Sequence, residues 1–524
     1  MSTPLGPRSA AISLATIADV ASGDLVGSAE VAIHGVTLDS RAVRPGDLYA
    51  ALPGSNHHGG SFVGGAVDAG AQAVLTDPAG AELIAAAGIS IPQVLVADPR
   101  AVLGAVAARV YGTHDPGLRL IGITGTNGKT TIAYLLAAAL EALGDTVGLI
   151  GTVETRIGSE RVRSVRTTPE SPEVHRLLAL MGERSVDDCV MEVSSHALAL
   201  HRVDGICFDL ALFTNLSQDH LDFHPDMADY FAAKASLFTP TRARRGLICI
   251  DGEWGQHLAA RASIPVVTLG SSSSADYQVL SATSAEGSEH PTETAEFVLL
   301  TPRGSRLSLR SALPGVFNVT NTAMATAALI EGGIAEEDVV RAVLSDPHVP
   351  GRMERVSAPA DAGRGTDPEQ DPLAIVDYAH TPDAVAAAIT ALQHATTGPL
   401  IVVLGAGGGR DVGKREPMGR AAAQADIVIV TDDNPRSEHP AEIRAAVLRG
   451  AHAAGTDAVI EEVAGRRDAI VRAVELARQA PRRATIALVG KGHESGQEID
   501  GVVHPFDDRV ELQHALSATP GEDR

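Results

Sequence analysis

The sequence contains few aromatic residues, few cysteines and no long apolar run. Aromatic side chains make up 3% of the 524 residues, and only three cysteines and one tryptophan are present. Cys189, Cys207 and Cys249 lie far apart in apolar stretches, so we expect reduced core thiols rather than a disulfide framework or a cysteine-based metal site. The N-terminus lacks a signal-peptide pattern and no segment is long enough for a membrane span, which predicts a cytoplasmic protein.

Positive charge is scarce as well. The chain has 42 Lys and Arg residues against 65 Asp and Glu residues, a formal net charge of −23. This balance argues against a general nucleic-acid-binding surface, and an anionic ligand would need basic groups gathered at particular loops and helix starts. A chain of this length needs roughly two to four domains. Its abundant alanine, glycine and valine suit α/β layers.

The most informative segment joins an apolar strand to a helix through a glycine-rich turn. Residues 118–123 have the pattern of a buried strand, and a helical pattern runs from Lys129 to about residue 143. This context is typical of a phosphate-binding loop, in which backbone N–H groups and the helix N-terminus face phosphate oxygens. The first glycine of the usual motif would fall at Ile123, and Gly122 lies one place earlier. We expect nucleoside triphosphate binding by Gly125, Thr126, Asn127, Gly128, Lys129, Thr130 and Thr131.

Two turn-rich stretches, His114–Gly117 and His348–Gly351, divide the chain into predicted domains at residues 1–116, 117–349 and 350–524. Alternating strands and helices predict an α/β protein with a central, mainly parallel P-loop-type sheet and a doubly wound, Rossmann-like C-terminal domain. The polar stretch Ala358–Pro372 is predicted to be a surface insertion. The expected strands are Gly35–Leu38, Asp47–Ala51, Ala73–Thr76, Val94–Ala97, Val147–Ile150, Asp188–Glu192, Leu210–Asn215, Gly246–Ile250, Val266–Leu269, Glu296–Leu300, Arg306–Leu309, Leu373–Asp377, Leu400–Gly405, Ile427–Thr431 and Thr485–Val489.

Three residues of the middle section allow both a structural and a chemical interpretation. Glu192 ends an apolar strand, where a carboxylate can hold Mg²⁺ beside a phosphate loop or simply face solvent. His220 lies between two aspartates and is a metal ligand, a base or a structural histidine. Lys234 falls in a mostly apolar helical segment, where a lysine usually extends its ammonium group from a core helix toward water.

Four strands of the third section each end in a turn that carries a charged group. The turns are Asp377–Asp383, Gly405–Asp411, Asp432–Arg436 and Gly490–Glu494. Each is an ordinary turn when taken alone, but four at successive strand ends favour a ligand site. Arg410 occupies the third glycine position of a dinucleotide fingerprint, which argues against NAD. Arginine in two of the turns suits the recognition of a carboxylate.

Taken together, these motifs resemble the Mur ligases, ATP-dependent amide-forming enzymes of peptidoglycan precursor synthesis. The resemblance covers nearly the whole chain and has the same three-domain order, with motifs at Thr124–Thr131, Glu192–His196, Asn215–Asp222, Asp433–Arg436 and Gly490–Glu494. It is greatest to the members that add the third residue of the stem peptide. The resemblance implies transfer of the γ-phosphoryl of ATP to a carboxylate, and attack by an amine on the resulting acyl phosphate.

The resemblance also implies a role for each matching residue. Leu38, Ser40, Ser55, Asn56 and His57 would hold the UDP end of UDP-MurNAc-L-Ala-D-Glu, and Thr167, Thr168, Ser194 and Arg202 its muramoyl-dipeptide part. Lys129, Lys234, His220 and Glu192 would be catalytic, with Thr130, Glu192, His220 and a carbamylated Lys234 around Mg²⁺. Asn318, Arg352, Asp377 and His380 would contact ATP. Arg410, Asp433, Asn434, Pro435, Arg436, Gly490 and Glu494 would bind the incoming amino acid.

Arg436 decides which amino acid we expect. An arginine can pair with the distal carboxylate of meso-diaminopimelate, which L-lysine lacks, and lysine-adding relatives generally lack this arginine. Two departures from the family weaken the implied nucleotide-sugar contacts, because Leu200 and Arg166 stand where many relatives have glutamine and asparagine.

Several alternatives remain open from the sequence. They are a lysine-adding ligase, a D-Ala-D-Ala-adding ligase, folylpolyglutamate synthase, a scaffold without catalysis and a P-loop nucleotide-binding regulator. The sequence has no Asn-Lys-x-Asp guanine motif. We expect a monomer whose hinges lie near Pro116 and Pro350.

Overall fold

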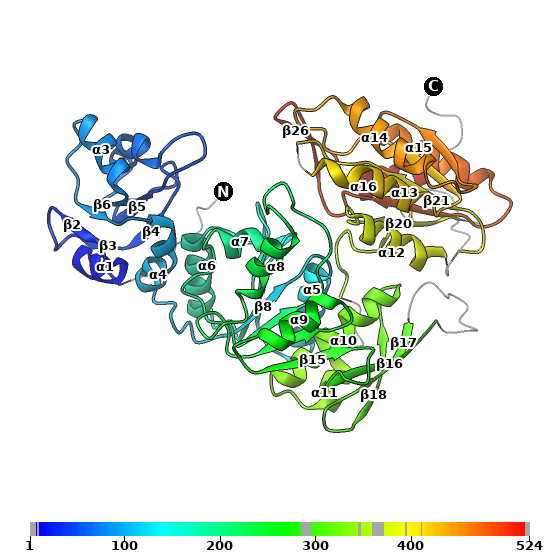
Figure 1. The fold of residues 1–524 in the computed structure, drawn as a ribbon, viewed down its shortest axis with the longest axis horizontal. Coiled ribbons are helices and arrows are strands. Elements are labelled where there is room, and N and C mark those ends of the chain that lie inside the picture. The colour runs from blue at the N-terminus through cyan, green and yellow to red at the C-terminus, as the bar shows by residue number, and fades with distance from the viewer. Residues whose placement is uncertain are drawn as a thin grey trace.

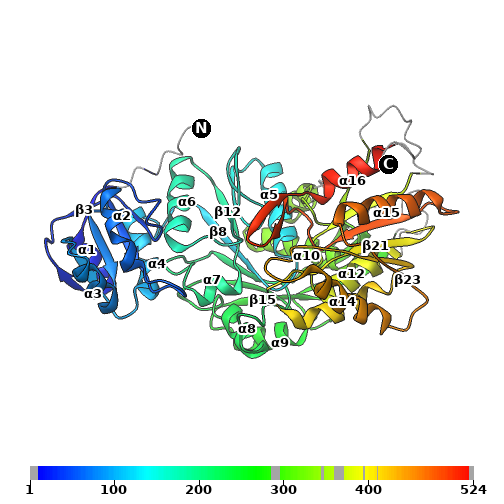
Figure 2. The same ribbon diagram turned by 90° about the horizontal axis from the view of Figure 1, so that it is seen from above.

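The computed structural model describes residues 7, 10–284, 295–343, 347–358, 371–393, 396–409 and 411–518. Three sheets follow one another along the chain and form three bodies, with the N-terminal body at one end of the molecule and the central body next to it (Figures 1 and 2). The predicted insertion at 358–372 lies almost entirely outside the described residues, and so does Arg410.

The N-terminal body is a five-stranded sheet of order β2-β7-β6-β5-β4, in which β4 to β7 run parallel. Helix α4 begins at Pro99, with Asp98 as its N-cap, and packs against α6 of the central body. The elements are β1 Ile12–Ser13, α1 Leu14–Ala21, β2 Asp24–Val26, β3 Ala32–Ile33, β4 Gly35–Thr37, β5 Asp47–Ala51, η1 Gly59–Phe62, α2 Val63–Asp68, β6 Ala73–Thr76, α3 Pro78–Ala86, β7 Gln93–Leu95 and α4 Pro99–Tyr111.

The central body is an eleven-stranded sheet of order β11-β10-β9-β12-β8-β13-β14-β15-β16-β17-β18. The strands from β9 to β16 in this order are parallel, and antiparallel strands form both edges. Its strands are β8 Arg119–Thr124, β9 Val147–Ile150, β10 Glu154–Ile157, β11 Glu160–Arg163, β12 Asp188–Glu192, β13 Leu210–Phe213, β14 Gly246–Cys249, β15 Val266–Gly270, β16 Tyr277–Ser284, β17 Ala295–Leu300 and β18 Arg306–Ser311. Its helices are α5 Lys129–Leu143, α6 Ser171–Glu183, α7 Ser195–Ala199, α8 Met227–Ala235, α9 Glu253–Arg261, α10 Val316–Glu331 and α11 Glu336–Val343.

The C-terminal body is a six-stranded sheet of order β19-β20-β24-β21-β22-β23, parallel except for β19. A separate hairpin of β25 and β26 follows the last strand of the sheet. The elements are β19 Glu354–Arg355, β20 Leu373–Asp377, α12 Pro382–Gln393, β21 Leu400–Leu404, η2 Val412–Lys414, α13 Arg415–Ala422, β22 Ile427–Val430, α14 Pro440–His452, β23 Val459–Glu462, α15 Arg466–Gln479, β24 Thr485–Val489, β25 Gly496–Ile499, β26 Val502–Pro505 and α16 Asp508–Ser517.

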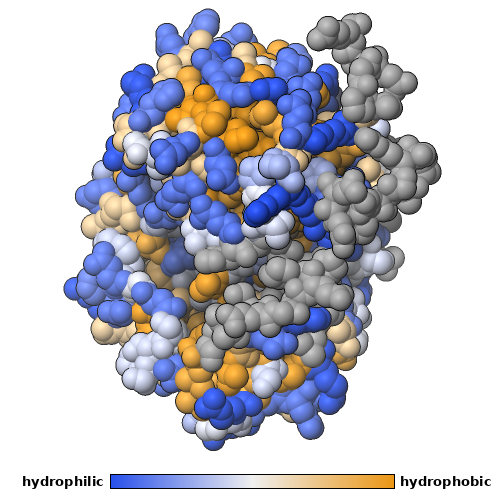
Figure 3. Space-filling view, turned by 90° about the vertical axis from the view of Figure 1, so that its right-hand side faces the viewer, coloured by the Kyte–Doolittle hydropathy of each residue, from blue (hydrophilic) through white to orange (hydrophobic). Residues whose placement is uncertain are grey.

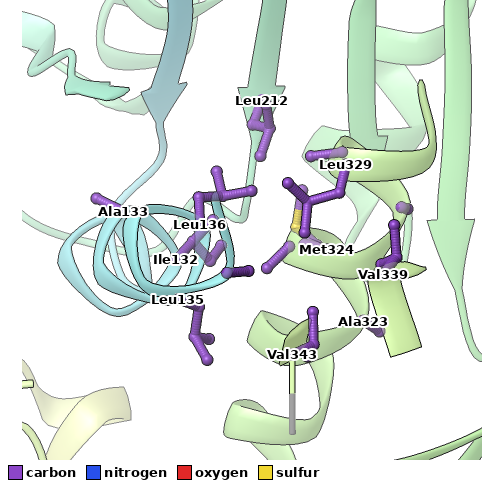
Figure 4. Close-up of a cluster of buried hydrophobic side chains, with 14 of the residues drawn as sticks. Ile132, Ala133, Leu135, Leu136, Leu212, Ala323, Met324, Leu329, Val339 and Val343 are labelled. Atoms are coloured by element: carbon purple, nitrogen blue, oxygen red, sulfur yellow. The ribbon is translucent and has the colours of Figure 1, made fainter. Parts of the chain in front are cut away.

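Alternation along the buried strands places a core on each face of these sheets. In β20, Leu373 and Ile375 belong to one apolar cluster, whereas Ala374 and Val376 belong to another. This is the pattern of a sheet covered by helices on both sides, and it confirms the predicted α/β class with mainly parallel sheets. In the central body, α5 packs its apolar side chains against α10 and α11, which fixes the helix that begins at Lys129 (Figure 4).

Two features differ from the sequence prediction. Six strands end one or two residues before their expected last residues, which were Leu38, Ala97, Asn215, Ile250, Gly405 and Thr431. The hairpins β10–β11 and β25–β26 and the strand β16 had not been predicted, since their short, polar or serine-rich sequences lack apolar alternation. The predicted hairpin of Glu296–Leu300 and Arg306–Leu309 is present as β17 and β18.

Within the described residues, no helix is both long and apolar enough to cross a membrane. On the face shown in Figure 3, hydrophilic side chains surround separate hydrophobic patches.

Candidate active site

A cavity of about 220 Å³ lies between the central and C-terminal bodies, at the C-terminal ends of their parallel strands. This is where ligands gather in open α/β sheets. The cavity brings together residues that are far apart in the sequence, so the folding of two domains assembles it. From the central body it is lined by Thr126, Asn127, Gly128, Lys129, Thr130, Thr152, Thr167, Glu192, Ser194, Asp219, His220 and Asp222; from the C-terminal side by Arg352, Tyr378, His380, Gly405, Ala406, Gly407, Asp411, Lys414, Met418, Asp433, Asn434, Arg436, Gly490 and Glu494.

The glycine-rich turn has the close backbone packing expected of a phosphate-binding loop. Gly125 has φ +145°, and a Cβ there would lie 1.9 Å from Thr214 Oγ1, so only glycine fits. Gly128, with φ +89°, is the N-cap of α5. The loop is held from β13's end: the Thr214 hydroxyl donates to the Asn127 carbonyl at 2.6 Å, and Asn215 Oδ1 accepts from the Asn127 N–H at 2.9 Å.

Two lysines lie against this loop. Lys129 Nζ donates to the carbonyl oxygens of Gly125 at 2.9 Å and Thr126 at 2.8 Å. Lys234, on α8, is 1% exposed and donates to the same Gly125 oxygen at 2.8 Å. Burial lowers the pKa of Lys129; burial and the adjacent Lys129 lower the pKa of Lys234 well below its usual value. The expectation that Lys234 extends its ammonium group from the helix toward water was therefore wrong. The ammonium group contacts the phosphate loop instead.

Glu192 and Thr130 meet beside the loop, and both side chains are buried. The Thr130 hydroxyl donates to Glu192 Oε2 at 2.9 Å. Thr152 fixes the carboxylate through its N–H, at 2.8 Å, and its hydroxyl, at 2.9 Å. Mg²⁺ at nucleotide sites takes one or two protein oxygens with phosphate and water, so this pair of hard oxygen donors fits the ion. No cluster of three or more His, Cys, Asp or Glu residues arranged for a metal occurs among the described residues.

Asp219 forms a charged contact between the two bodies. Its carboxylate lies 3.4 Å from His220 Nε2, 3.7 Å from His380 Nε2 and 3.7 Å from Lys414 Nζ, of which the last two belong to the C-terminal body. Burial opposes ionisation of Asp219, but its contacts with His380, His220 and Lys414 lower its pKa overall. Burial lowers the pKa of His220 to about 3 and that of His380 to about 4, so both imidazoles are neutral at pH 7.

A second cavity, of about 360 Å³, adjoins the phosphate loop on its other side. Six predicted nucleotide contacts line it: Asn127, Gly128, Thr131, Asn318, Arg352 and Asp377. Of these, Asn127, Gly128 and Arg352 also line the first cavity. Both oxygens of Asp377 accept backbone hydrogen bonds, from Met353 at 2.7 Å and Ala379 at 2.8 Å. Arg352 donates to Thr130 Oγ1 at 3.1 Å while its guanidinium lies 4.4 Å from the centre of the Tyr378 ring. Arg352 therefore touches both bodies at once.

The C-terminal turns form a connected polar network. Asn434 donates to Glu494 Oε2 at 2.8 Å, and the fully buried Lys491 donates to Glu494 at 3.1 Å and to the Gly496 carbonyl at 2.7 Å. Gly490 has φ +112° and a Cβ there would lie 2.8 Å from Asp433 Oδ2. Pro435 is buried beneath the turn. Arg436, with φ +53°, lines the cavity.

The residues expected to hold the muramoyl dipeptide are at the central body's edge of the cavity. Thr167 and Ser194 line it. The Thr168 hydroxyl donates to the Glu192 carbonyl at 2.8 Å. Arg202 Nε lies 2.9 Å from Glu170, whose carboxylate also pairs with Arg100, at 3.1 Å, and Arg166, at 2.8 Å. Arg166 is thus one of three arginines around a single glutamate, a group with a net positive charge. A neutral asparagine at this position could not form this ion pair.

The five predicted UDP contacts lie away from the cavity. Leu38 and Ser40 follow β4, and Ser55, Asn56 and His57 follow β5 as an exposed loop. Parallel strands β4 and β5 bring the two segments to the same edge of the N-terminal sheet. None of the five lines either of the two cavities described above.

Two lysines of the site were given no role from the sequence, although a signal was available: Lys414, which lines the cavity, and Lys491, which belongs to the polar network of the C-terminal turns. The 524 residues contain only four lysines: Lys129, Lys234, Lys414 and Lys491. All four belong to the site, while the surface ion pairs use arginine. The lysine side chain ends in a compact ammonium group with three donors, whereas arginine ends in a larger planar group. In a chain that otherwise uses arginine, each lysine therefore marks a position where an arginine would be a poor substitute.

Comparisons with known proteins agree with this architecture. Three family models match: "Mur ligase family, catalytic domain" over residues 32–111, "Mur ligase middle domain" over 123–329 and "Mur ligase, glutamate ligase domain" over 351–492.

Full-length relatives match as well. The chain is 49% identical to the UDP-N-acetylmuramoyl-L-alanyl-D-glutamate--2,6-diaminopimelate ligase of Streptomyces coelicolor, over 99% of this chain and 100% of the relative. It is 46% identical to the enzyme of that name from Corynebacterium glutamicum, over 93% and 92%. A solved structure of a ligase of that name has a TM-score of 0.64 at 30% identity, and the match covers 97% of this chain and 99% of that one. The chain therefore belongs to the Mur ligase family.

Proposed function

We propose that this chain is the ATP-dependent ligase that joins meso-diaminopimelate to the side-chain carboxylate of D-Glu in UDP-MurNAc-L-Ala-D-Glu, during peptidoglycan precursor synthesis. One observation carries the proposal: a single cavity unites the phosphate loop, at Lys129 and Thr130, with the arginine of the C-terminal turn, Arg436. Relatives that carry this name and are 43–49% identical to the chain support it.

The reaction needs an activated carboxylate, because oxide is a poor leaving group. A carboxylate oxygen of D-Glu attacks the γ-phosphorus of ATP, the bond to the β-phosphate oxygen breaks, and ADP leaves. The amine of the amino acid then attacks the acyl carbon, the bond to the phosphate oxygen breaks, and the nitrogen loses a proton. The polypeptide contributes mainly positioning and charge stabilisation at the phosphoryl group.

In this scheme the central body holds the triphosphate. The Gly125–Thr131 loop and the start of α5 bind phosphate oxygens, and Lys129 reaches the terminal phosphates. Thr130 and Glu192 would hold Mg²⁺, which neutralises charge on the phosphates. His220 and His380 face the same cavity as neutral imidazoles. Asn318, Arg352 and Asp377 would line the nucleoside side, where the second cavity lies.

We propose that Lys234 acts as a carbamate. Only a neutral amine reacts with CO₂, and burial beside Lys129 lowers the pKa of Lys234. In that reaction the amine nitrogen forms a bond to carbon and loses a proton. The product is a carboxylate, which turns a group that repels cations into a ligand for one.

The three bodies would divide the substrates between them. Residues 1–116 hold the UDP end, residues 117–349 hold ATP and the muramoyl dipeptide, and residues 350–524 hold the amino acid through Asp433, Asn434, Arg436, Gly490 and Glu494, with Arg410 in the adjoining turn. The UDP contacts lie outside the cavity, so the bodies must approach one another, with hinges near Pro116 and Pro350. Because ATP and UDP-sugars are cytoplasmic metabolites, we propose that the chain works there, as a monomer.

The test is phosphate release from ATP with purified protein, Mg²⁺ and UDP-MurNAc-L-Ala-D-Glu, comparing meso-diaminopimelate with L-lysine. Turnover with diaminopimelate alone is expected. Turnover with lysine at an equal kcat/KM would keep the ligation chemistry and overturn the assigned amino acid. No turnover with either, under conditions where ATP binds, would overturn the ligase proposal.

A further inference from the structure

Lys414 differs from the other three lysines, because its ammonium group makes no hydrogen bond within the described residues. Lys129, Lys234 and Lys491 each donate to at least one carbonyl oxygen. The Lys414 side chain is only 14% exposed and lines the cavity that contains the phosphate loop. Its charged contact is with Asp219, whose Oδ1 lies 3.7 Å from Nζ, which is too far for a hydrogen bond. Polar groups buried to this extent are normally hydrogen-bonded, so the three N–H donors of Lys414 are available to a ligand.

Asp219 places this ammonium group beside the phosphate loop. It follows β13, which pairs in parallel with β8, so the loops after both strands lie at one edge of the sheet. Two residues before Asp219, the Ser217 N–H donates to Thr126 Oγ1 at 3.1 Å, and the Thr126 hydroxyl donates to the Ser217 carbonyl at 3.2 Å. The His220 N–H donates to Asp219 Oδ1 at 3.0 Å and fixes the carboxylate. Lys414 therefore extends from the C-terminal body to a carboxylate that is anchored on the phosphate loop.

The carboxylate of Asp219 also serves the two lysines of the loop. Burial lowers the pKa of Lys129 and of Lys234; Glu192 and Asp219 oppose this at Lys129, and Asp219 opposes it at Lys234. Together with Lys414, three ammonium groups therefore depend on two carboxylates. A ligand with several anionic oxygens would balance this positive charge, and lysine is well suited to phosphate oxygens because its charge is compact.

We propose that Lys414 is a further catalytic residue of the ligation, which donates hydrogen bonds to the phosphoryl oxygens while the group passes from ATP to the D-Glu carboxylate. This inference rests on the proposed function. In that step the carboxylate oxygen forms a bond to the γ-phosphorus, and the bond to the bridging oxygen breaks with its electron pair leaving on ADP. Lys414 keeps its proton throughout and stabilises charge on the transferred oxygens. Asp219 is a positioning residue, which holds the ammonium group where the phosphoryl group arrives.

The competing role for Lys414 is binding of the amino acid. Its charged contact is with the central body, however, and the turns that would hold the amino acid have a lysine of their own, Lys491, 3.1 Å from Glu494. Kinetics separate the two roles. A residue that acts on the transferred phosphoryl group alters the rate of that step, whereas a ligand of the amino acid alters the KM for the amino acid.

The test is ADP formation in a single turnover, measured by rapid quench with protein in excess over ATP and with saturating UDP-MurNAc-L-Ala-D-Glu and meso-diaminopimelate. Lys414→Gln removes the charge and keeps a polar side chain. We expect its rate constant to fall about 100-fold, while the steady-state KM values for ATP and diaminopimelate stay within about twofold. The matched control is Arg420→Gln, because Arg420 is an exposed cation on α13 that does not line the cavity. Its rate constant should be that of the unmodified protein.

An unchanged rate constant in Lys414→Gln would overturn the inference, and so would a normal rate constant combined with a raised KM for diaminopimelate. The double variant Asp219→Asn, Lys414→Gln tests a purely structural role, because it removes the carboxylate that the single variant leaves without its lysine. Recovery of the rate in the double variant would overturn the inference, and a rate that stays low supports it. Failure of the proposed function is a separate result, because the unmodified protein would then form no ADP with these substrates.

Discussion

Lys129 and Lys234 donate hydrogen bonds to the same carbonyl oxygen, that of Gly125. One comes from the first residue of α5 and the other from α8, more than 100 residues later in the chain. Two ammonium groups so close together in a buried site repel each other, and burial has already lowered the pKa of both. The arrangement favours loss of a proton from Lys234, which has no carboxylate partner within 4 Å among the described residues.

The first prediction concerns that amine. We expect protein in ¹³C-bicarbonate to show a carbamate carbon signal, and Lys234→Arg to lack it because a guanidinium does not react in this way. The variant should lose at least about 100-fold in kcat. The measurements are ¹³C NMR and phosphate release. Since only four lysines are present, Lys414→Arg and Lys491→Arg provide controls for the assignment of the signal. A signal that persists in Lys234→Arg would contradict the prediction.

The second prediction concerns selectivity. Arg436→Ala should lower kcat/KM for meso-diaminopimelate by about 100-fold or more, because the distal carboxylate then has no cationic partner. Nucleotide binding should be unchanged, since Arg436 lies on the C-terminal turn and does not touch the phosphate loop. Isothermal titration with an ATP analogue and steady-state kinetics measure the two effects. Unaltered kinetics with diaminopimelate would count against the assigned amino acid.

The third prediction concerns the buried Lys491. Lys491→Met removes the donor that joins Asn434, Glu494 and the Gly496 carbonyl, at 3.4, 3.1 and 2.7 Å. Leaving Glu494 without its cation should raise KM for the amino acid by about tenfold and leave KM for ATP unchanged. Lys491→Arg should restore little, because the surrounding space holds a compact ammonium group. Equal changes in both KM values would indicate general loss of structure instead.

The fourth prediction is a pH dependence of stability. His175 is buried, its Nδ1 accepts from the Thr113 hydroxyl at 2.6 Å, and its Nε2 donates to the Asp204 carbonyl at 3.0 Å. Burial lowers its pKa from 6.5 to about 4. Between those pH values the unfolded chain holds a proton that the folded chain does not, so stability falls as pH falls, by about 1.4 kcal/mol per pH unit. His175→Gln should reduce that slope in denaturant unfolding from pH 6.5 to 4. Parallel slopes would exclude His175 as the source.

The sequence predicted most of the fold because the buried strands carry their own signal. Strands such as Asp188–Glu192 and Thr485–Val489 are continuous apolar runs bounded by turns, and the structure has them at those bounds. The hairpin of β25 and β26 lacked such a signal, because its four-residue strands are half-exposed or exposed and its stability comes from bonds to Arg436 and Asn434. Contacts of that kind depend on the tertiary structure and leave no local pattern.

The residues of the candidate site also fall into two groups, those with a local sequence signal and those without one. Lys129, Glu192 and Arg436 could be picked out because each lies at or shortly after the end of a strand, within a recognisable motif. Lys234 could not be distinguished from a core-helix lysine by its neighbours alone, and only the family resemblance reversed that interpretation. Thr152 gave no signal, because its importance comes from its contact with Glu192, which lies 40 residues later in the sequence.

Arg352 has a consequence for how the two halves of the reaction communicate. Its guanidinium donates to Thr130 at the start of α5 and lies over the ring of Tyr378, which follows the first long strand of the C-terminal sheet. If nucleotide binding moves Thr130, the contacts of Arg352 change as well, and so does the free energy with which the C-terminal body packs against the central body. Thermodynamic linkage makes this effect reciprocal: if ATP improves amino acid affinity by a given factor, the amino acid improves ATP affinity by the same factor. A coupling of about 1 kcal/mol, roughly fivefold, would be enough to make the substrates help one another to assemble.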